Sequence, residues 1–289
     1  MYLIILYYKY IYIENPEAIT ALQRELCIRL DLTGRIIIAH EGINGTLEGT
    51  ADNIEKYIKE TKKIKEFSDI NFKKSEGQGR SFPKLSVKLR KEIVTLGRPN
   101  IFPIPSETGA DYMNAEDLHM LLEKKKDEVV VLDMRNEYEL KVGKFDSSIA
   151  LPVQNFREIP AHARELEKYK NKTVVAVCTG GVRCEKGTAY LKQELGFEHI
   201  YQLHDGIVTY MTKYPRGHFK GALYVFDGRV TMRTDGMPVE VIGKCELCGS
   251  ASEKFVNCSL AKCHKHFIVC LTCLEKSGGE KKIVCDKEH

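Results

Sequence analysis

The chain contains no run of 18 uninterrupted apolar residues, which is about the shortest stretch that crosses a bilayer as a helix. Its first residues, MYLIILYYKYIYIENPEAI, are apolar, but no basic stretch precedes them and no small-residue cleavage site follows. Those absences argue against a secretory signal, and the Ile, Leu and Tyr content predicts a β-strand. We therefore expect no membrane-spanning helix and a cytosolic protein.

The sequence also lacks a phosphate-binding loop and a dinucleotide-binding fingerprint, so it gives no sign of a nucleotide redox cofactor. Two histidines and a carboxylate spaced as iron ligands do not stand out either. Internal repeats and low-complexity tracts are missing as well. What remains is an ordinary soluble composition, with 43% hydrophobic and 29% charged residues.

The length and the charge distribution of the chain limit its possible domain organisation and partners. The 289 residues suggest two to three domains. The net charge of +4 is mild, but residues 56–98 hold 13 Lys/Arg against 5 Asp/Glu. Such a local excess indicates either a surface that binds a polyanionic partner or a solvent-exposed helix face followed by a linking segment.

Residues 1–95 alternate between strand and helix patterns. Asn15-Pro16 predicts a helix start, and residues 34–49 predict two strands around a Gly/Asn turn. A second helix follows, opened by Thr50 or Asp52, and then strand patterns. The order βαββαβ predicts a ferredoxin-like domain with a four-stranded sheet. The open face of such a sheet can bind RNA, although many such domains do not.

Residues 96–109 are rich in proline and glycine and predict a linker. In residues 110–215, helix patterns, one of them spanning residues 156–171, alternate with the apolar strands VVVL and VVAV. Continuous apolar strands are typical of a parallel sheet covered on both faces. Residues 216–289 contain a hairpin pattern with Asp227-Gly228 at its turn and a cysteine-rich tail. The fold class is thus α/β and α+β multidomain.

Seven of the ten cysteines lie in this tail, and without a secretory signal their pattern favours metal over disulfides. Two C-x-x-C pairs about 20 residues apart predict one complete tetrahedral zinc site with a structural role. A second site would use the other three cysteines with one of the histidines His264, His266 or His289, and interleaved sites are an alternative. The expected ligands are Cys245, Cys248, Cys270 and Cys273 for the first site, and Cys258, Cys263 and Cys285 for the second.

The stretch VVAVCTGGVRCEKGTAY places Cys178 at the carboxyl end of a strand and before a helix, where ligands bind in open α/β sheets. Gly180 and Gly181 allow the backbone to curl. The backbone N–H groups of the loop Thr179, Gly180, Gly181 and Val182 are expected to form an anion cradle. With Arg183, this cradle would lower the pKa of the thiol and make Cys178 a nucleophile or atom carrier. The alternative is a buried structural cysteine in an ordinary turn.

CTGGVR, together with CEKGTAYLKQELGF, IYQLHDGI and the upstream VLDMRNEYELKVGKF, resembles the rhodanese domain, whose active-site loop runs from a cysteine to an arginine. Lys144-Phe145 and Asp205 depart from that pattern away from the loop. Cys184 follows Arg183 directly. It is either a resolving thiol for a Cys178 persulfide or a residue of the helix start.

AHEGINGTLEGT, FPKLSVKLRKEIVTLG, CTGGVRCEKGTAYL, GHFKGALYVFDGRV and the cysteine-rich tail occur in this order. The combination resembles the rhodanese-containing tRNA uridine hydroxylases, the TrhO family, over nearly the whole chain. The resemblance implies oxygen-dependent 5-hydroxylation of the wobble uridine, position 34, in tRNA. It implies O2 as co-substrate and Cys178 as the essential cysteine, acting as a thiolate or persulfide. The electron donor, the tRNA set and the oligomeric state are not visible in the sequence.

Two other functions fit parts of the chain. A sulfurtransferase would move sulfane sulfur through a Cys178 persulfide, but it would not need the N-terminal domain, the basic run or the tail. A non-catalytic RNA-binding protein would not need Cys178 and Arg183. The segment HEGING, His40 to Gly45, is either a second wall of the site or a plain turn.

Overall fold

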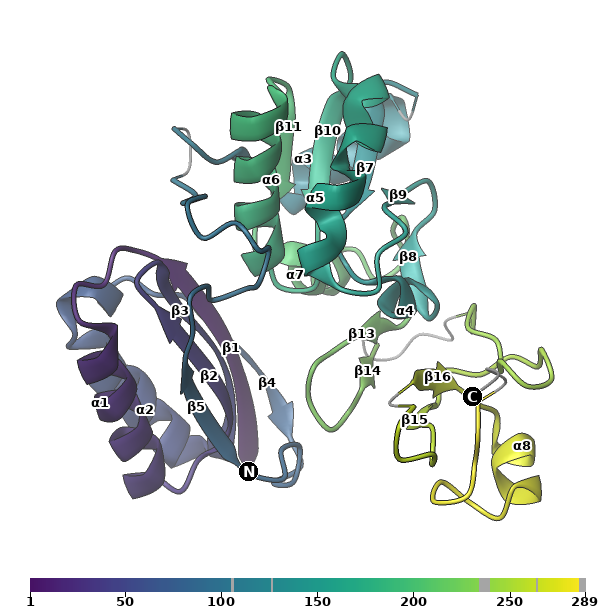
Figure 1. Cartoon of the computed structure of the whole chain (residues 1–289), viewed down its shortest axis with the longest axis horizontal. Coiled ribbons are helices and arrows are strands. Elements are labelled where there is room, and N and C mark those ends of the chain that lie inside the picture. The colour runs from purple at the N-terminus through teal and green to yellow at the C-terminus, as the bar shows by residue number, and fades with distance from the viewer. Residues whose placement is uncertain (105–106, 126, 234–239, 264, 286–289) are drawn as a thin grey trace. The chain divides into compact units, whose positions relative to one another are not determined.

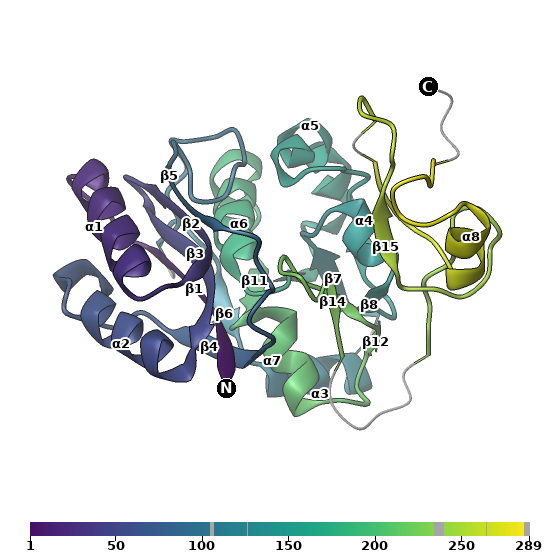
Figure 2. The ribbon, with the colours of Figure 1, turned by 90° about the horizontal axis from the view of Figure 1, so that it is seen from below.

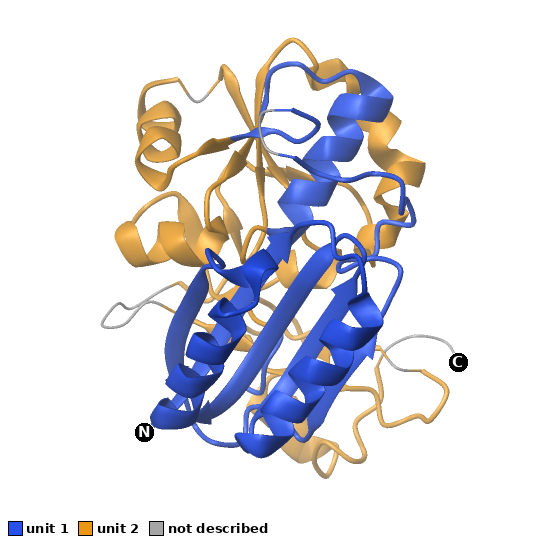
Figure 3. Cartoon of the chain, turned by 90° about the vertical axis from the view of Figure 1, so that its left-hand side faces the viewer, with its two compact units in different colours: residues 1–111, 182–200, 226–229 blue, residues 112–181, 201–225, 230–289 orange. Residues whose placement is uncertain are grey.

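The computed structural model describes residues 1–104, 107–125, 127–233, 240–263 and 265–285 (Figure 1). The chain divides into two compact units (Figure 3). Unit 1 consists of residues 1–111, 182–200 and 226–229, and unit 2 of residues 112–181, 201–225 and 230–289. Unit 1 therefore includes a helix and a loop that lie far from the N-terminal domain in the sequence.

Unit 1 contains a five-stranded sheet with the order β4-β1-β3-β2-β5 (Figure 1). Its first four strands pair antiparallel, as a βαββαβ domain requires. The fifth strand pairs parallel to β2, so the predicted ferredoxin-like arrangement is confirmed but has one edge strand more than expected. The strands are β1 (Tyr2–Tyr10), β2 (Thr33–Ala39), β3 (Gly42–Thr50), β4 (Phe72–Gly77) and β5 (Leu85–Leu89).

Two helices, α1 (Pro16–Arg29) and α2 (Ala51–Lys62), lie side by side on one face of this sheet (Figures 1 and 2). A single-turn 3-10 helix, η1 (Lys65–Phe67), follows α2. Both helix starts agree with the sequence patterns, since Asn15 accepts from Ala18 N and Thr50 accepts from Asn53 N. The core between helices and sheet is fully buried at its centre, where Ile36, Ile38 and Ile54 are 0% exposed.

The turn between β2 and β3 differs from the prediction. Ala39 pairs with Gly42, so His40 and Glu41 form the turn, and the Gly/Asn residues of HEGING lie in β3. Gly42 has φ +140°, and a Cβ there would lie 2.0 Å from the Lys9 carbonyl oxygen. Gly42 is therefore required by the close approach of β1 rather than by a turn.

The second face of this sheet is not open, contrary to one expectation. In unit 1, Tyr8 and Tyr10 of β1 donate hydrogen bonds to Glu185 Oε1 (3.1 Å) and to the carbonyl oxygen of Val182 (3.2 Å). Both acceptors belong to α6 (Val182–Leu195). This face carries apolar residues such as Ile4, which is 2% exposed, and such a surface must be covered. This part of the sheet therefore has partners within unit 1.

Unit 2 is built around a five-stranded sheet with the order β6-β11-β10-β7-β9, in which β7 pairs parallel to both β10 and β9. Val129 and Val131 of β7 and Val175 and Val177 of β10 pack into one core with α3 and α7. The predicted parallel α/β sheet is confirmed. Its strands are β6 (Asp111–Met113), β7 (Val129–Asp133), β9 (Ile149–Ala150), β10 (Thr173–Val177) and β11 (Ile200–Leu203), and its helices include α3 (Ala115–Lys124), α4 (Glu137–Leu140) and α7 (Gly206–Lys213).

Residues 156–171, predicted as one helix, form three short pieces instead. They are η2 (Phe156–Glu158), α5 (Ile159–His162) and η3 (Ala163–Tyr169), of which η2 and η3 are 3-10 helices. Pro160 explains the break, because proline has no N–H and fits only the first turn of a helix, where it stands in α5.

The remaining strands form short pairs. β8 (Gly143–Phe145) pairs with β12 (Phe219–Gly221), and β15 (Phe255–Asn257) pairs with β16 (His266–Ile268) before α8 (Leu271–Lys276). β13 (Leu223–Tyr224) pairs with β14 (Thr231–Met232), so the predicted hairpin is present with Asp227-Gly228 in its loop. Among the described residues, no helix combines the length and the apolar character needed to cross a membrane.

Candidate active site and cysteine clusters

Cys178 directly follows β10, at the carboxyl end of the central strand of unit 2. It is fully buried, and its sulfur accepts a hydrogen bond from the Gly181 N–H at 3.2 Å. Gly181 has φ +106°, a conformation that a residue with a side chain rarely adopts. Gly180 does not take a positive φ, so Gly181 alone makes the curl that the sequence attributed to both glycines.

The start of α7 supports this loop from behind. The Ile207 and Val208 N–H groups donate to the carbonyl oxygens of Cys178 (2.9 Å) and Thr179 (3.2 Å). Gly206 has φ +76°, and a Cβ there would lie 2.8 Å from the Cys178 oxygen. Asp205 takes the left-handed conformation, φ +63°, which explains why glycine is common at this position in rhodanese domains. The backbone of Cys178 is therefore held by the start of α7.

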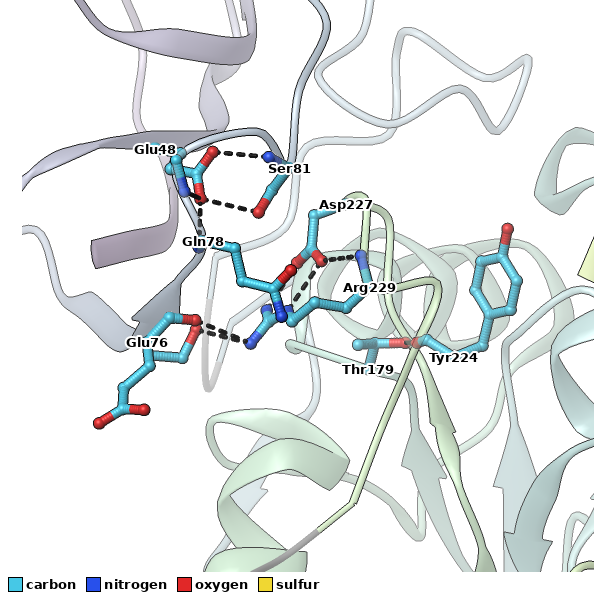
Figure 4. A network of polar contacts seen from close by, with 10 residues as sticks. Glu48, Glu76, Gln78, Ser81, Thr179, Tyr224, Asp227 and Arg229 are labelled. Carbon is cyan, nitrogen blue, oxygen red and sulfur yellow. Dashed lines mark hydrogen bonds and ion pairs between the residues drawn. The ribbon is translucent and has the colours of Figure 1, made fainter. Parts of the chain in front are cut away.

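Thr179 ties the loop to two other segments of unit 2. Its hydroxyl lies 3.5 Å from Glu139 Oε2 and 3.4 Å from the carbonyl oxygen of Tyr224 (Figure 4), both long for hydrogen bonds. Glu139 is fully buried and accepts from the Asn136 N–H at 2.9 Å, closing a capping box at the start of α4. The loop thus sits against both α4 and the hairpin β13–β14.

Val182, Arg183 and Cys184 form the first turn of α6 and belong to unit 1. The Arg183 guanidinium lies 5.4 Å from the ring centre of Phe226, also in unit 1. Cys184 is fully buried, and neither Cys178 nor Cys184 forms a disulfide. The predicted loop lies between β10 and α6, as the sequence indicated. The roles of its residues stay predictions.

Lys186 is a charged residue of this helix that sequence reasoning missed. It is fully buried in unit 1, forms an ion pair with Glu41 and lies 3.1 Å from Glu92 Oε1. Burial raises the pKa of Glu41, and the ammonium group of Lys186 opposes that shift. The Ile93 N–H also donates to Glu41 at 2.7 Å. The turn of HEGING is therefore joined to the thiol helix through a buried ionic cluster, a link that only the tertiary structure reveals.

Four of the tail cysteines form one cluster. Their sulfur atoms all lie within 4.8 Å of one another, and the Cys248 and Cys270 sulfurs are 3.6 Å apart. Tetrahedral zinc–thiolate bonds of about 2.3 Å imply sulfur–sulfur distances close to these values. A hydrogen bond with Ser250 lowers the pKa of Cys248 to about 6. The donor set fits a metal ion, and its members are the predicted Cys245, Cys248, Cys270 and Cys273.

Cys258, Cys263 and Cys285 form a second cluster, with 3.5 Å between the sulfurs of Cys263 and Cys285. His266, one of three histidines considered for this site, lies elsewhere, because its ring nitrogens face Tyr224 and Asn257. Burial lowers the pKa of His266. His264 and His289 lie outside the described residues. The described part of the chain thus brings together the three cysteines predicted for this site.

A third group, His119, Glu123 and His218 of unit 2, brings two imidazoles and a carboxylate within 4.8 Å. The sequence did not suggest it, because His218 is far from α3 in the chain. His119 is hydrogen-bonded to the Tyr210 hydroxyl at 2.9 Å and stacks on Tyr214, and His218 lies 2.9 Å from Glu123. His119, Glu123 and His218 are thus held together by contacts with one another and with Tyr210 and Tyr214.

Comparison with known proteins matches three stretches of the chain to family descriptions. Residues 2–93 match the UPF0176 acylphosphatase like domain, residues 114–213 the rhodanese-like domain, and residues 220–288 the rhodanase C-terminal segment. Together they include the βαββαβ domain, the Cys178 loop and the cysteine-rich tail.

A protein named tRNA uridine(34) hydroxylase from Cytophaga hutchinsonii is 40% identical over 278 residues, which cover 96% of this chain and 88% of that protein. Proteins of the same name from Staphylococcus haemolyticus and Corynebacterium jeikeium are 39% and 38% identical, covering 100% and 93% of this chain and 90% and 89% of theirs. The chain belongs to the tRNA uridine(34) hydroxylase family. The resemblance seen in the sequence motifs is thereby confirmed. Membership in the tRNA uridine(34) hydroxylase family rests on nearly the whole length, not on the rhodanese-like domain alone.

Proposed function

We propose that this protein hydroxylates carbon 5 of the wobble uridine, position 34, in tRNA, with Cys178 as its essential residue. The observation that carries the proposal is the Cys178 loop, set at the carboxyl end of a parallel strand in a chain related over 96% of its length to a tRNA uridine(34) hydroxylase. In open α/β sheets this edge is where ligands bind.

The proposed chemistry begins with an ionised sulfur on Cys178, as thiolate or persulfide. The Gly181 N–H points at the sulfur from 3.2 Å, and α6 directs its N-terminal dipole toward the loop that precedes it. Both features favour negative charge on sulfur. Arg183, in the first turn of α6, supplies a cation for a reaction intermediate or for phosphate.

The proposed oxygen source is O2, which makes the protein an oxidoreductase. Replacing the C5–H bond of uracil by C5–OH with O2 releases the second oxygen atom as water, and this requires two electrons and two protons from a donor. The sequence motifs of the chain do not identify that electron donor. The protein's own contribution would be to hold the base against the sulfur in a site closed to water.

The proposed substrate is tRNA, bound in the cytoplasm where unmodified anticodons are available. Lysines and arginines of residues 56–98 would contact the phosphate backbone, which contributes affinity more than sequence choice. In the tail we propose zinc as the metal of the four-cysteine cluster and of the three-cysteine cluster, with a structural role, because four thiolates leave no open position on the first ion.

The test uses a strain that lacks the gene and carries a plasmid copy of it, with wobble-position nucleosides measured by mass spectrometry. Cys178→Ala should abolish 5-hydroxyuridine and its derivatives. Cys27→Ala is the matched control, since Cys27 is a core thiol of unit 1 whose pKa burial raises to about 12, and it should leave them unchanged. Cys184→Ser should keep most of the product.

Undiminished hydroxylation with Cys178→Ala would refute the role of that thiol. If the wild-type gene instead restores only thiolated uridine, the protein is a sulfurtransferase that carries sulfane sulfur on Cys178. Loss of product with Cys184→Ser as well would assign that thiol the resolving role.

A further inference from the structure

His119, Glu123 and His218 of unit 2 bring two imidazole rings and a carboxylate together outside the thiol loop. One ligand atom of each residue lies within 4.8 Å of the other two. His119 and Glu123 stand four residues apart on α3, a spacing that places them on the same face of the helix. His218 directly precedes β12 and reaches α3 from a distant segment of the chain. The group is therefore a product of the tertiary structure.

A single buried hydroxyl holds both histidines. Tyr210 belongs to α7, which lies beside α3 (Figure 2), and it is 0% exposed. Its oxygen lies 2.9 Å from Nδ1 of His119 and accepts a hydrogen bond from the His218 N–H at 3.2 Å. The Asp146 N–H donates to the His218 carbonyl oxygen at 3.0 Å. The backbone of His218 is therefore fixed from two sides.

The ring of His119 is fixed in its plane as well. It stacks on Tyr214, with 4.0 Å between the ring centres and 8° between the ring planes. A histidine that binds a metal through Nε2 carries its proton on Nδ1, and this N–H requires an acceptor. The Tyr210 oxygen is in position to accept it. His119 is therefore held in the way that metal-binding histidines are held, with Nε2 as the coordinating nitrogen.

Nε2 of His218 is buried and lies 2.9 Å from Glu123 Oε1. The two groups do not form a hydrogen bond in this arrangement, and Nε2 has no hydrogen-bond partner among the described residues. A buried polar atom without such a partner is uncommon. Bonds of about 2.0–2.2 Å from a metal ion to nitrogen and oxygen place neighbouring ligand atoms about 3 Å apart. The spacing of this pair therefore fits two ligands of one ion.

Glu123 opens the group to solvent. Its side chain is 59% exposed, against 20% for His218, so an ion has an entry path from water. The packed rings supply the rigid part of the site, and the carboxylate supplies the negative charge that neutral imidazoles lack. Three protein ligands leave a coordination position open, as in metal sites that bind water or a substrate atom.

We propose that His119, Glu123 and His218 bind a divalent transition-metal ion at a site separate from the cysteine clusters. Imidazole nitrogen suits zinc, nickel, copper and iron, whereas magnesium and calcium prefer oxygen ligands. The ion is coordinated by Nε2 of both histidines and by a Glu123 oxygen, and it joins α3 to the segment before β12. Its open position takes water or an anionic group.

Equilibrium dialysis of the full-length protein against zinc, with the bound metal counted by elemental analysis, tests the proposal. The cysteine clusters contribute equally in every variant compared, so the difference in zinc content reports on this site alone. His218→Ala and Glu123→Ala should each bind one zinc ion per chain fewer than the wild type. Tyr210→Phe should bind this ion about 10- to 100-fold more weakly, the usual cost of removing a group that orients a metal ligand.

The matched control is His162→Ala. His162 lies 3.0 Å from Glu165, but neither residue belongs to a group of three metal ligands among the described residues. This variant should bind as much zinc as the wild type, and a loss equal to that of His218→Ala would overturn the proposal as nonspecific binding to histidine.

Equal zinc content in the wild type, His218→Ala and Glu123→Ala at every free zinc concentration would also overturn the proposal. Circular dichroism shows whether each variant is folded. If His218→Ala does not fold, Glu123→Ala decides, because its change lies at an exposed side chain. One ion fewer then supports the site, and an unchanged content refutes it. Neither result depends on the proposed hydroxylase activity.

Discussion

At the scale of single residues, the thiol loop and the cluster around Lys186 show opposite degrees of predictability. Cys178 is adjacent in sequence to the groups that bind it, because the Gly181 N–H and the N-terminus of α6 follow within a few residues. The partners of Lys186 are Glu41 and Glu92, which are separated from it by about a hundred residues or more.

Removing Lys186 should be costly. Lys186→Met leaves Glu41 and Glu92 buried without their cation, and breaking a buried pair in this way costs about 3–5 kcal/mol in the free energy of unfolding. The matched control is Lys63→Met, because Lys63 forms an exposed pair with Glu60, a type of pair worth roughly 0–1 kcal/mol. Urea unfolding of both variants measures the difference, and equal losses would contradict a stabilising buried cluster.

The sequence could therefore predict Cys178, Arg183 and the tail cysteines as candidate site residues, since their patterns are local. It could not identify Lys186, which reads as an ordinary surface lysine of a helix until the tertiary structure buries it. Phe226 was missed for a related reason. It is notable only through its contact with Arg183, a residue that is distant from it in the sequence.

At the scale of elements, capping residues correctly predicted where helices start. Contacts in which two backbone segments approach closely could not be predicted from the sequence. Asn15 and Thr50 start helices as expected, because a cap bonds only to its own first turn. The position of the β2–β3 turn was misplaced because Gly42 serves a contact with β1, and a glycine required by packing is indistinguishable in sequence from one required by a turn. Pro160 indicated the break within residues 156–171, whereas the pattern of apolar residues predicted one continuous helix.

The junction of α7 with the thiol loop gives an element-level prediction. Gly206→Ala places a Cβ against the Cys178 and Thr179 carbonyl oxygens, at 2.8 and 2.7 Å, and should displace the sulfur. We expect at least about a tenfold loss of hydroxylation, since small misplacements of reacting groups cost up to about 10²-fold.

The control for this variant is Gly196→Ala. Gly196 also has a positive φ, +65°, but a Cβ there would meet nothing within 4 Å. It bears the same cost of positive φ, about 1–2 kcal/mol, without pressing on the loop. Equal activity of the two variants would show that α7 does not position Cys178.

At the scale of the whole molecule, the chain's division into units does not follow its order. Helix α6 and residues 226–229 belong with the N-terminal domain in unit 1, although the sequence places them in later segments (Figure 3). Sequence patterns describe continuous segments, so they could not predict that α6 and residues 226–229 belong to unit 1. The family match covers nearly the whole chain and therefore includes segments of both units.

The cysteine-rich tail should depend on metal as a separate cooperative element. The purified protein is expected to contain zinc, and Cys270→Ser should lose the ion of the four-cysteine cluster while Cys27→Ser keeps it. Elemental analysis measures the metal. Limited proteolysis should cut only the tail of the metal-free protein, because the apolar cluster of the tail, around Phe267 and Val269, is too small to stabilise such a segment without a metal. Unchanged proteolysis after complete removal of metal would contradict a structural role.

Hydroxylation of the wobble uridine of tRNA is the activity that we propose for this chain. Its most direct test is a comparison of all position-34 nucleosides by mass spectrometry in strains with and without the gene. We expect 5-hydroxyuridine and its derivatives to disappear in the strain without the gene, while thiolated uridines remain. Retained hydroxylation together with lost thiolation would contradict it and identify a sulfurtransferase.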